Sequence, residues 1–191
     1  MKKYELTKET VTISGKTLYR IRAVRDFGSV KTGEFGGYIE KEENLSHFGD
    51  AWVYGNAKVS GKAWVRGNAE VSGNAKVRGN AWICGNAKVS GNAEVSGNAK
   101  VSGNARVSGN AEVSNTRHYF VQGPIGSRDG FATFYKTKDD TIAVKCGCFL
   151  GSLQEFVNQV EETHGGSRYE KEYKLAAELA KVCIRLEGES K

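Results

Sequence analysis

Eleven consecutive six-residue repeats, or hexads, fill the middle of the chain and restrict what it can fold into. They run without a gap from residue 51 to residue 116, and most read Ala-X-Val-X-Gly-Asn. A period this strict is typical of a solenoid. Alternation along each hexad places Ala and Val on one side of a short strand, and Gly-Asn tolerates the left-handed backbone of a tight corner. We therefore expect three hexads to form one triangular coil of 18 residues.

Residues 18 apart in the sequence should then stack in adjacent coils, about 4.8 Å from each other. The Val side chains would fill the interior, and the outward side chains would form columns. One face would carry Trp64, Trp82 and Lys100 in one column, beside a second column that begins at Arg66 and Cys84. A second face would carry one column of Trp52, Glu70, Lys88 and Arg106. The third face would carry one column of Lys58, Lys76, Glu94 and Glu112.

Two outward tryptophans one coil apart are costly to leave in water. We expect Trp64 and Trp82 to be buried under a cap or in an oligomer interface, because aromatic anchors mark interfaces. The alternative is a platform for a partner or ligand, to which Arg66 and Lys100 would add charge and cation–π contacts.

The segments on either side of the hexads abandon the repeat, so we expect three domains: residues 1–44, 45–116 and 117–191. The first should be a β cap with a hairpin over residues 11–24. Residues 45–50 read as a degenerate twelfth hexad with His47 in the place of an inward Val. In the third domain we expect strands at 118–122, 131–136 and 141–146, and two helices that begin at the capping boxes Ser152–Glu155 and Ser167–Glu170.

The hexads, with Val or Ile at every sixth position from Val53 to Val113, resemble the hexapeptide-repeat left-handed β-helix family. Residues 25–40 and the C-terminal motifs GPIGSRDG and CGCF resemble phage and prophage hexapeptide-repeat proteins with a small α+β C-terminal module. The resemblance implies a mainly β fold: a left-handed parallel β-helix with an N-terminal β-hairpin cap and a small C-terminal α+β domain. It also implies a homo-oligomer, either a trimer or a dimer, and a phage protein in the cytoplasm of its host cell.

The formal net charge of +6 lies almost entirely on the hexads. A basic surface attracts nucleic acid, a nucleotide or an acidic protein, although the glutamates interrupt the basic columns. We expect no membrane contact and no signal peptide, because the chain has no long apolar run and starts in polar sequence. Four cysteines, at positions 84, 146, 148 and 183, lack zinc-ligand spacing, so we expect reduced thiols and no metal.

Members of the resembled family that are acyltransferases use a histidine as general base and a loop that interrupts the coils. The hexads here contain neither. We expect His47, His118 and His164 to have structural roles, and we therefore predict no catalytic residue, no cofactor and no enzyme activity.

The loop Gly123–Gly130 is a further candidate site, since Ser127, Arg128 and backbone amides can hold an anion. A plain strand-to-strand turn is the alternative. We predict a binding protein for a host protein, and an inhibitor of a host protein or defence system is the hypothesis that the resemblance suggests. The predicted binding residues are Trp64, Arg66, Trp82, Lys100, Ser127 and Arg128. An acyltransferase, a small-nucleotide sponge and a nucleic-acid binder remain open.

Overall fold

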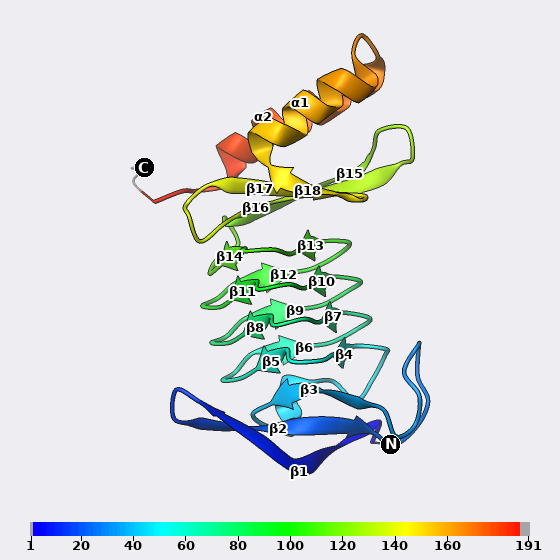
Figure 1. Cartoon of the computed structure of the whole chain (residues 1–191), viewed down its shortest axis with the longest axis vertical. Helices are drawn as coiled ribbons and strands as arrows, with labels where there is room; N and C mark the ends of the chain where they lie inside the picture. The colour runs from blue at the N-terminus through cyan, green and yellow to red at the C-terminus, as the bar shows by residue number, and fades with distance from the viewer. Residues whose placement is uncertain (1, 188–191) are drawn as a thin grey trace.

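A three-sided prism of short strands forms the middle of the molecule (Figure 1). The structure is a computed structural model that describes residues 2–187. A β-hairpin lies at one end of the prism, and an antiparallel sheet covered by two helices lies at the other. The fold is therefore mainly β, as the repeat predicts.

The elements run in this order. At the N-terminal end are β1 (Tyr4–Ile13), β2 (Lys16–Ala23), β3 (Phe35–Ile39) and the 3-10 helix η1 (Glu42–Asn44). The prism strands are β4 (Trp52–Val53), β5 (Lys58–Val59), β6 (Trp64–Val65), β7 (Glu70–Val71), β8 (Lys76–Val77), β9 (Trp82–Ile83), β10 (Lys88–Val89), β11 (Glu94–Val95), β12 (Lys100–Val101), β13 (Arg106–Val107) and β14 (Glu112–Val113). The C-terminal elements are β15 (Tyr119–Ile125), β16 (Gly130–Lys136), β17 (Ile142–Cys146), β18 (Phe149–Ser152), α1 (Leu153–His164) and α2 (Arg168–Cys183).

Strands 18 residues apart pair in parallel, which confirms the predicted columns. Trp64 is in register with Trp82, and Trp82 with Lys100. The strands form three stacks, β5-β8-β11-β14, β4-β7-β10-β13 and β6-β9-β12. The Ala and Val of each hexad are buried inside the prism, while the residue between them faces outward.

The corner glycines have positive φ angles, and those from Gly61 to Gly91 lie against the glycines of the next coil. Gly91 has a φ of +67°, and a methyl group added to it would lie 2.9 Å from the backbone nitrogen of Gly109. Glycine is therefore required at this position for two reasons: the backbone conformation and the close contact between coils.

The first coil differs from the predicted spacing, and the placement of His47 at an inward position is wrong. Leu45 takes that position, because it bridges Val65 in parallel and is buried. Leu45 and Val65 are 20 residues apart, whereas Val53 and Val71 are 18 apart. Two extra residues therefore lie between Leu45 and Val53, and the chain bulges outward around His47.

The N-terminal hairpin closes one end of the prism. β1 and β2 are antiparallel as predicted, and β3 joins them to the prism by pairing in parallel with β5. Trp52, whose side chain is 1% exposed, packs against Tyr4 and Phe27 beneath this cap. Lys3 is also buried there, and its ammonium group donates to the carbonyl of Ala51 at 2.6 Å. Desolvation lowers the pKa of Lys3 to about 8.

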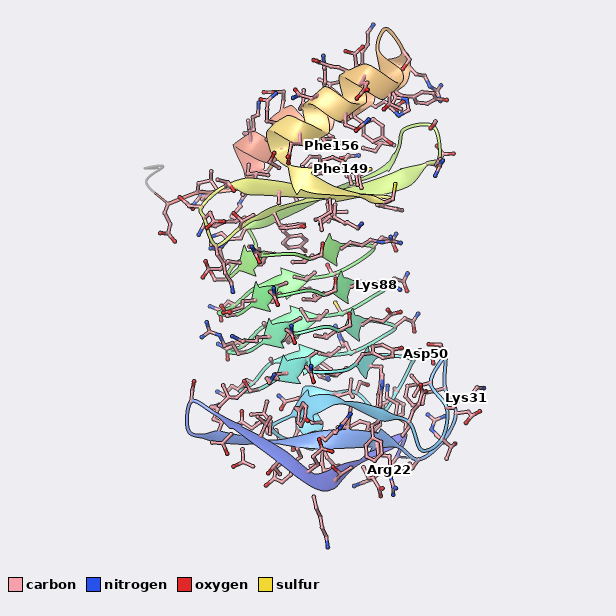
Figure 2. The ribbon with its side chains drawn as sticks, viewed as in Figure 1. Arg22, Lys31, Asp50, Lys88, Phe149 and Phe156 are labelled. Atoms are coloured by element: carbon pink, nitrogen blue, oxygen red, sulfur yellow. The ribbon has the colours of Figure 1, made fainter. Side chains whose placement is uncertain are left out.

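The C-terminal sheet, in the order β15-β16-β17-β18, closes the other end. Side chains of β16 alternate between its two faces. Tyr135 belongs to the prism core and lies 3.2 Å from the hydroxyl of Ser108, while Phe134 faces the helices. Phe149 and Phe156 lie between this sheet and α1 (Figure 2). The three predicted strands are present, and sequence reasoning missed the fourth, β18.

The helix starts were predicted at the correct residues. Ser152 and Glu155 form a reciprocal capping box at the start of α1. Ser167 caps α2 through the amide of Glu170, but the Glu170 carboxylate accepts from Gly166 instead of closing the predicted box. Within residues 2–187, the helices are too short and too polar to span a bilayer.

Candidate functional site

The strands β6, β9 and β12 form one face of the prism, which we call the Trp face and define by Trp64, Arg66, Trp82 and Lys100. These strands are stacked along the middle of the prism (Figure 1). The structure thus brings together four of the six residues predicted to bind a partner. The Trp82 side chain is 40% exposed, and Trp64 is partly exposed.

Aromatic and cationic groups are interleaved on the Trp face. The Trp64 and Trp82 rings meet edge to face with their centroids 5.7 Å apart. The Arg66 guanidinium lies 4.7 Å from the Trp64 ring and 5.3 Å from the Trp82 ring, and the Lys100 ammonium lies 5.8 Å from Trp82. Each such contact contributes about 0.5–1 kcal/mol at an exposed site. Arg66 is therefore held in place before any partner arrives.

Neither cap covers the Trp face. The caps lie at the two ends of the prism, and the tryptophan that the N-terminal cap buries is Trp52. Burial under a cap, one part of the prediction for Trp64 and Trp82, is therefore wrong for Trp82. The exposed pair remains available to an oligomer interface or to a partner.

Two further aromatic residues border the Trp face, and sequence reasoning missed both. Phe48, at the bulge in the first coil, is 80% exposed and lines a shallow hollow together with Trp64, Arg66 and Cys84. The Tyr119 hydroxyl donates to the Lys100 carbonyl at 2.6 Å, which places this ring at the other end of the face. The only sequence feature that could have indicated the exposure of Phe48 is the departure of residues 45–50 from the hexad pattern.

The Trp face has no carboxylate in its repeats. Hexads 63–68, 81–86 and 99–104 contain Arg66 and Lys100 but neither Asp nor Glu. On the neighbouring faces, by contrast, Lys88 pairs with Glu70 and Lys76 with Glu94. Figure 2 shows Lys88 pointing away from the prism. The Trp face is therefore the aromatic side of the prism, and its repeats hold no carboxylate to neutralise Arg66 and Lys100.

Ser127 and Arg128 lie far from this face, at the turn between β15 and β16. The amide of Gly126, which was expected to help hold an anion, donates instead to the Glu172 carboxylate at 2.7 Å. Ser127 and Arg128 line a cavity of about 430 Å³ whose floor includes Phe149, Phe156 and Tyr173. The Glu172 carboxylate thus occupies one of the backbone donors of this loop, and the choice between a turn and an anion site stays open for Ser127 and Arg128.

The histidines make local contacts with the chain itself. The ring of His47 stacks on Tyr4, and its Nδ1 accepts from the amide of Lys3. His118 contacts Ser114 and Asn115, and burial lowers its pKa. Both rings thus contact other residues of this chain, and the structural role expected for them stays a prediction.

His164 and the thiols near it lie in the C-terminal domain. His164 ends α1 as predicted, and its ring stacks on Tyr173. Burial raises the pKa of the Cys146 thiol, which keeps it protonated near neutral pH and makes it a poor nucleophile.

Comparison with known families supports the repeat architecture. A family described as YdcK Beta solenoid repeat matches residues 99–115, which cover the last coil of the prism, from β12 to β14. No curated protein matches the chain. The match agrees with the β-solenoid that the structure forms and concerns this segment alone.

Proposed function

We propose that this chain is a non-enzymatic binding protein whose Trp face docks an acidic partner protein. The observation that carries the proposal is the exposed cluster of Trp64, Arg66 and Trp82, which lies on a rigid prism and contains no carboxylate. Interface hot spots are enriched in Trp and Arg. Because stacking already fixes the Arg66 side chain, docking loses less side-chain entropy there.

Charge favours an acidic partner over a second copy of the chain. A symmetric dimer through this face would place the same patch on both sides of the interface. Arg66 and Lys100 of one copy would then approach the same cations of the other, and juxtaposed like charges are costly. A partner with carboxylates at these positions would instead form charge-assisted hydrogen bonds with Arg66. The homo-oligomer predicted from the sequence is therefore the alternative that the sedimentation experiment below distinguishes from an acidic partner.

The resemblance of the sequence to phage proteins suggests which partner to seek. On that ground we propose a phage-encoded inhibitor of a host protein or defence system, with the C-terminal domain assisting recognition. We consider an acyltransferase less well supported, because the hexads contain no histidine and the rings of His47 and His118 contact Tyr4 and Ser114 of the chain itself.

The test compares two variants for capture of an acidic protein from host lysate and for self-association by sedimentation. Arg66→Ser with Trp82→Lys keeps the net charge and uses residues that other hexads have at these positions. Arg106→Glu, on another face, is the control. We expect the double variant to lose affinity for the captured protein by at least about thirtyfold, as for a hot spot of 2 kcal/mol, and the control to retain it.

Two results would contradict the proposal. One is equal capture by the double variant and the wild type. The other is sedimentation as a dimer or trimer that the double variant abolishes, which would assign the Trp face to a second copy of the chain. Acetyl-CoA binding measured by calorimetry would revive the enzyme alternative.

A further inference from the structure

A second concave surface lies between the N-terminal hairpin and the prism, where the sequence motifs gave no reason to look. The closed end of the hairpin formed by β1 and β2 projects past the side of the prism on which β5, β8 and β11 lie (Figure 1). A cavity of about 530 Å³ separates the hairpin from these coils. We call it the hairpin groove. Its volume is in the range of small-molecule sites, which is about 300–1,000 Å³.

The walls of the hairpin groove are strongly basic. Five cationic side chains line it: Lys16 from the hairpin, and Lys58, Lys62, Lys76 and Arg78 from the prism. The stacking of adjacent coils brings the four prism cations together, and Lys16 joins them because the hairpin folds over the coils. A concave surface with one sign of charge concentrates the field and attracts ligands of the opposite charge.

Carboxylates neutralise only part of this charge. Glu40 pairs with Lys16 at 2.9 Å, and Glu94 contacts Lys76 at 3.2 Å and Arg78 at 3.5 Å. Hydrogen bonds from the Gly61 amide and Lys16 lower the pKa of Glu40, so this carboxylate is ionised at neutral pH. Two carboxylates therefore face five cations, which leaves the groove with a net positive charge.

The remaining lining residues indicate what kind of anion fits. Ile13, which is partly exposed, supplies an apolar contact, whereas Leu18 and Val77 lie behind it in the core and are buried. Ser60, Ser96 and Asn80 supply hydrogen-bonding groups. A ligand with a flat apolar ring system and several negative charges matches both parts of the lining.

The basic run is also short. In the outward column, Lys58 and Lys76 are followed by Glu94 and Glu112. The cations of this column therefore occupy only two adjacent strands, which are about 5 Å apart. A nucleic-acid strand requires a longer basic track.

We propose that the hairpin groove binds a small polyphosphorylated nucleoside, of the nucleoside di- or triphosphate class. The phosphates contact the Lys and Arg side chains, and the base lies toward Ile13. This site is separate from the Trp face and does not depend on the partner proposed for that face.

The repeat itself supplies variants that test this site. Lys62→Asn and Arg78→Ser restore the residues that most other hexads have at these two positions, so the combined variant should fold. Arg106→Glu changes the net charge by the same two units on a different face and is the matched control. Circular dichroism and thermal melting check that both variants are folded.

Calorimetric titration should use ATP, AMP, inorganic triphosphate and a single-stranded DNA 20-mer as probes. We expect ATP to bind in the micromolar range, AMP and triphosphate each to bind at least tenfold more weakly, and added salt to weaken binding. The combined variant should lose at least tenfold in ATP affinity, and the control should stay within twofold of the wild type.

Four results would overturn the proposal: no ATP binding at millimolar concentration, equal loss in the control, triphosphate binding as tight as that of ATP, or tighter binding of the DNA. Each of these can occur whether or not the Trp face binds a protein, so failure at one site leaves the other testable.

Discussion

The corner glycines allow a paired test of how the coils stack. Gly91 and Gly109 have nearly the same backbone conformation, with φ angles of +67° and +62°. A methyl group on Gly91 would lie 2.9 Å from the Gly109 nitrogen, whereas a methyl group on Gly109 would meet nothing within 4 Å. Alanine substitution at the two positions therefore has the same backbone cost but a different steric cost.

The expected magnitudes follow from these two terms. The left-handed conformation costs a non-glycine residue about 1–2 kcal/mol, so Gly109→Ala should lower the free energy of unfolding by that amount. Gly91→Ala should lower it by a further ~1–3 kcal/mol, because the next coil must shift to admit the methyl group.

Equilibrium unfolding in urea, with the slopes of the unfolding curves compared between variants, measures both values. Gly103→Ala, which also meets nothing within 4 Å, should behave like Gly109→Ala. Equal losses for Gly91→Ala and Gly109→Ala would refute the conclusion that the corner spacing is fixed by contact between coils.

Three further outcomes are expected. Because the pKa of Lys3 falls from 10.5 to about 8 on folding, the unfolded state binds more protons between these values. The free energy of unfolding should therefore rise between pH 8 and 10, by up to about 3 kcal/mol, and Lys3→Met should remove this rise, as followed by urea unfolding at each pH. Trp52→Ala should cost about 3–5 kcal/mol because it empties the space under the cap, whereas Trp82→Lys should change stability by less than about 1 kcal/mol in the same assay. Tyr135→Phe should cost about 1–2 kcal/mol by leaving the buried Ser108 hydroxyl without this partner, and thermal unfolding would show no change if the contact were unimportant.

The prism could be predicted from the sequence because its contacts repeat the same local pattern. The residue pattern of each hexad indicates which side chain faces inward and where the corner lies. The stacking of Trp64 on Trp82 follows because three hexads of six residues make one coil of 18. The same counting failed in the first coil, where two extra residues displace His47 and expose Phe48.

The hairpin groove could not be predicted, because it depends on the tertiary path of the hairpin. Lys16 is separated from Lys76 and Arg78 by several strands, and no local pattern places it beside them. The Gly123–Gly130 loop shows the converse: its residues suggest an anion cradle, but Glu172, on α2, already occupies the Gly126 amide.

Site-specific photo-crosslinking inside host cells tests the central claim most directly. A photoreactive residue in place of Ser102 reports on the Trp face, and one in place of Ser90 reports on a neighbouring face from the same position in its hexad. We predict an adduct with one acidic protein from position 102, lost when Arg66→Ser and Trp82→Lys are added, and no such adduct from position 90. Equal adducts from both positions, or an adduct at position 102 with a second copy of the chain alone, would contradict the claim that this face binds an acidic partner protein.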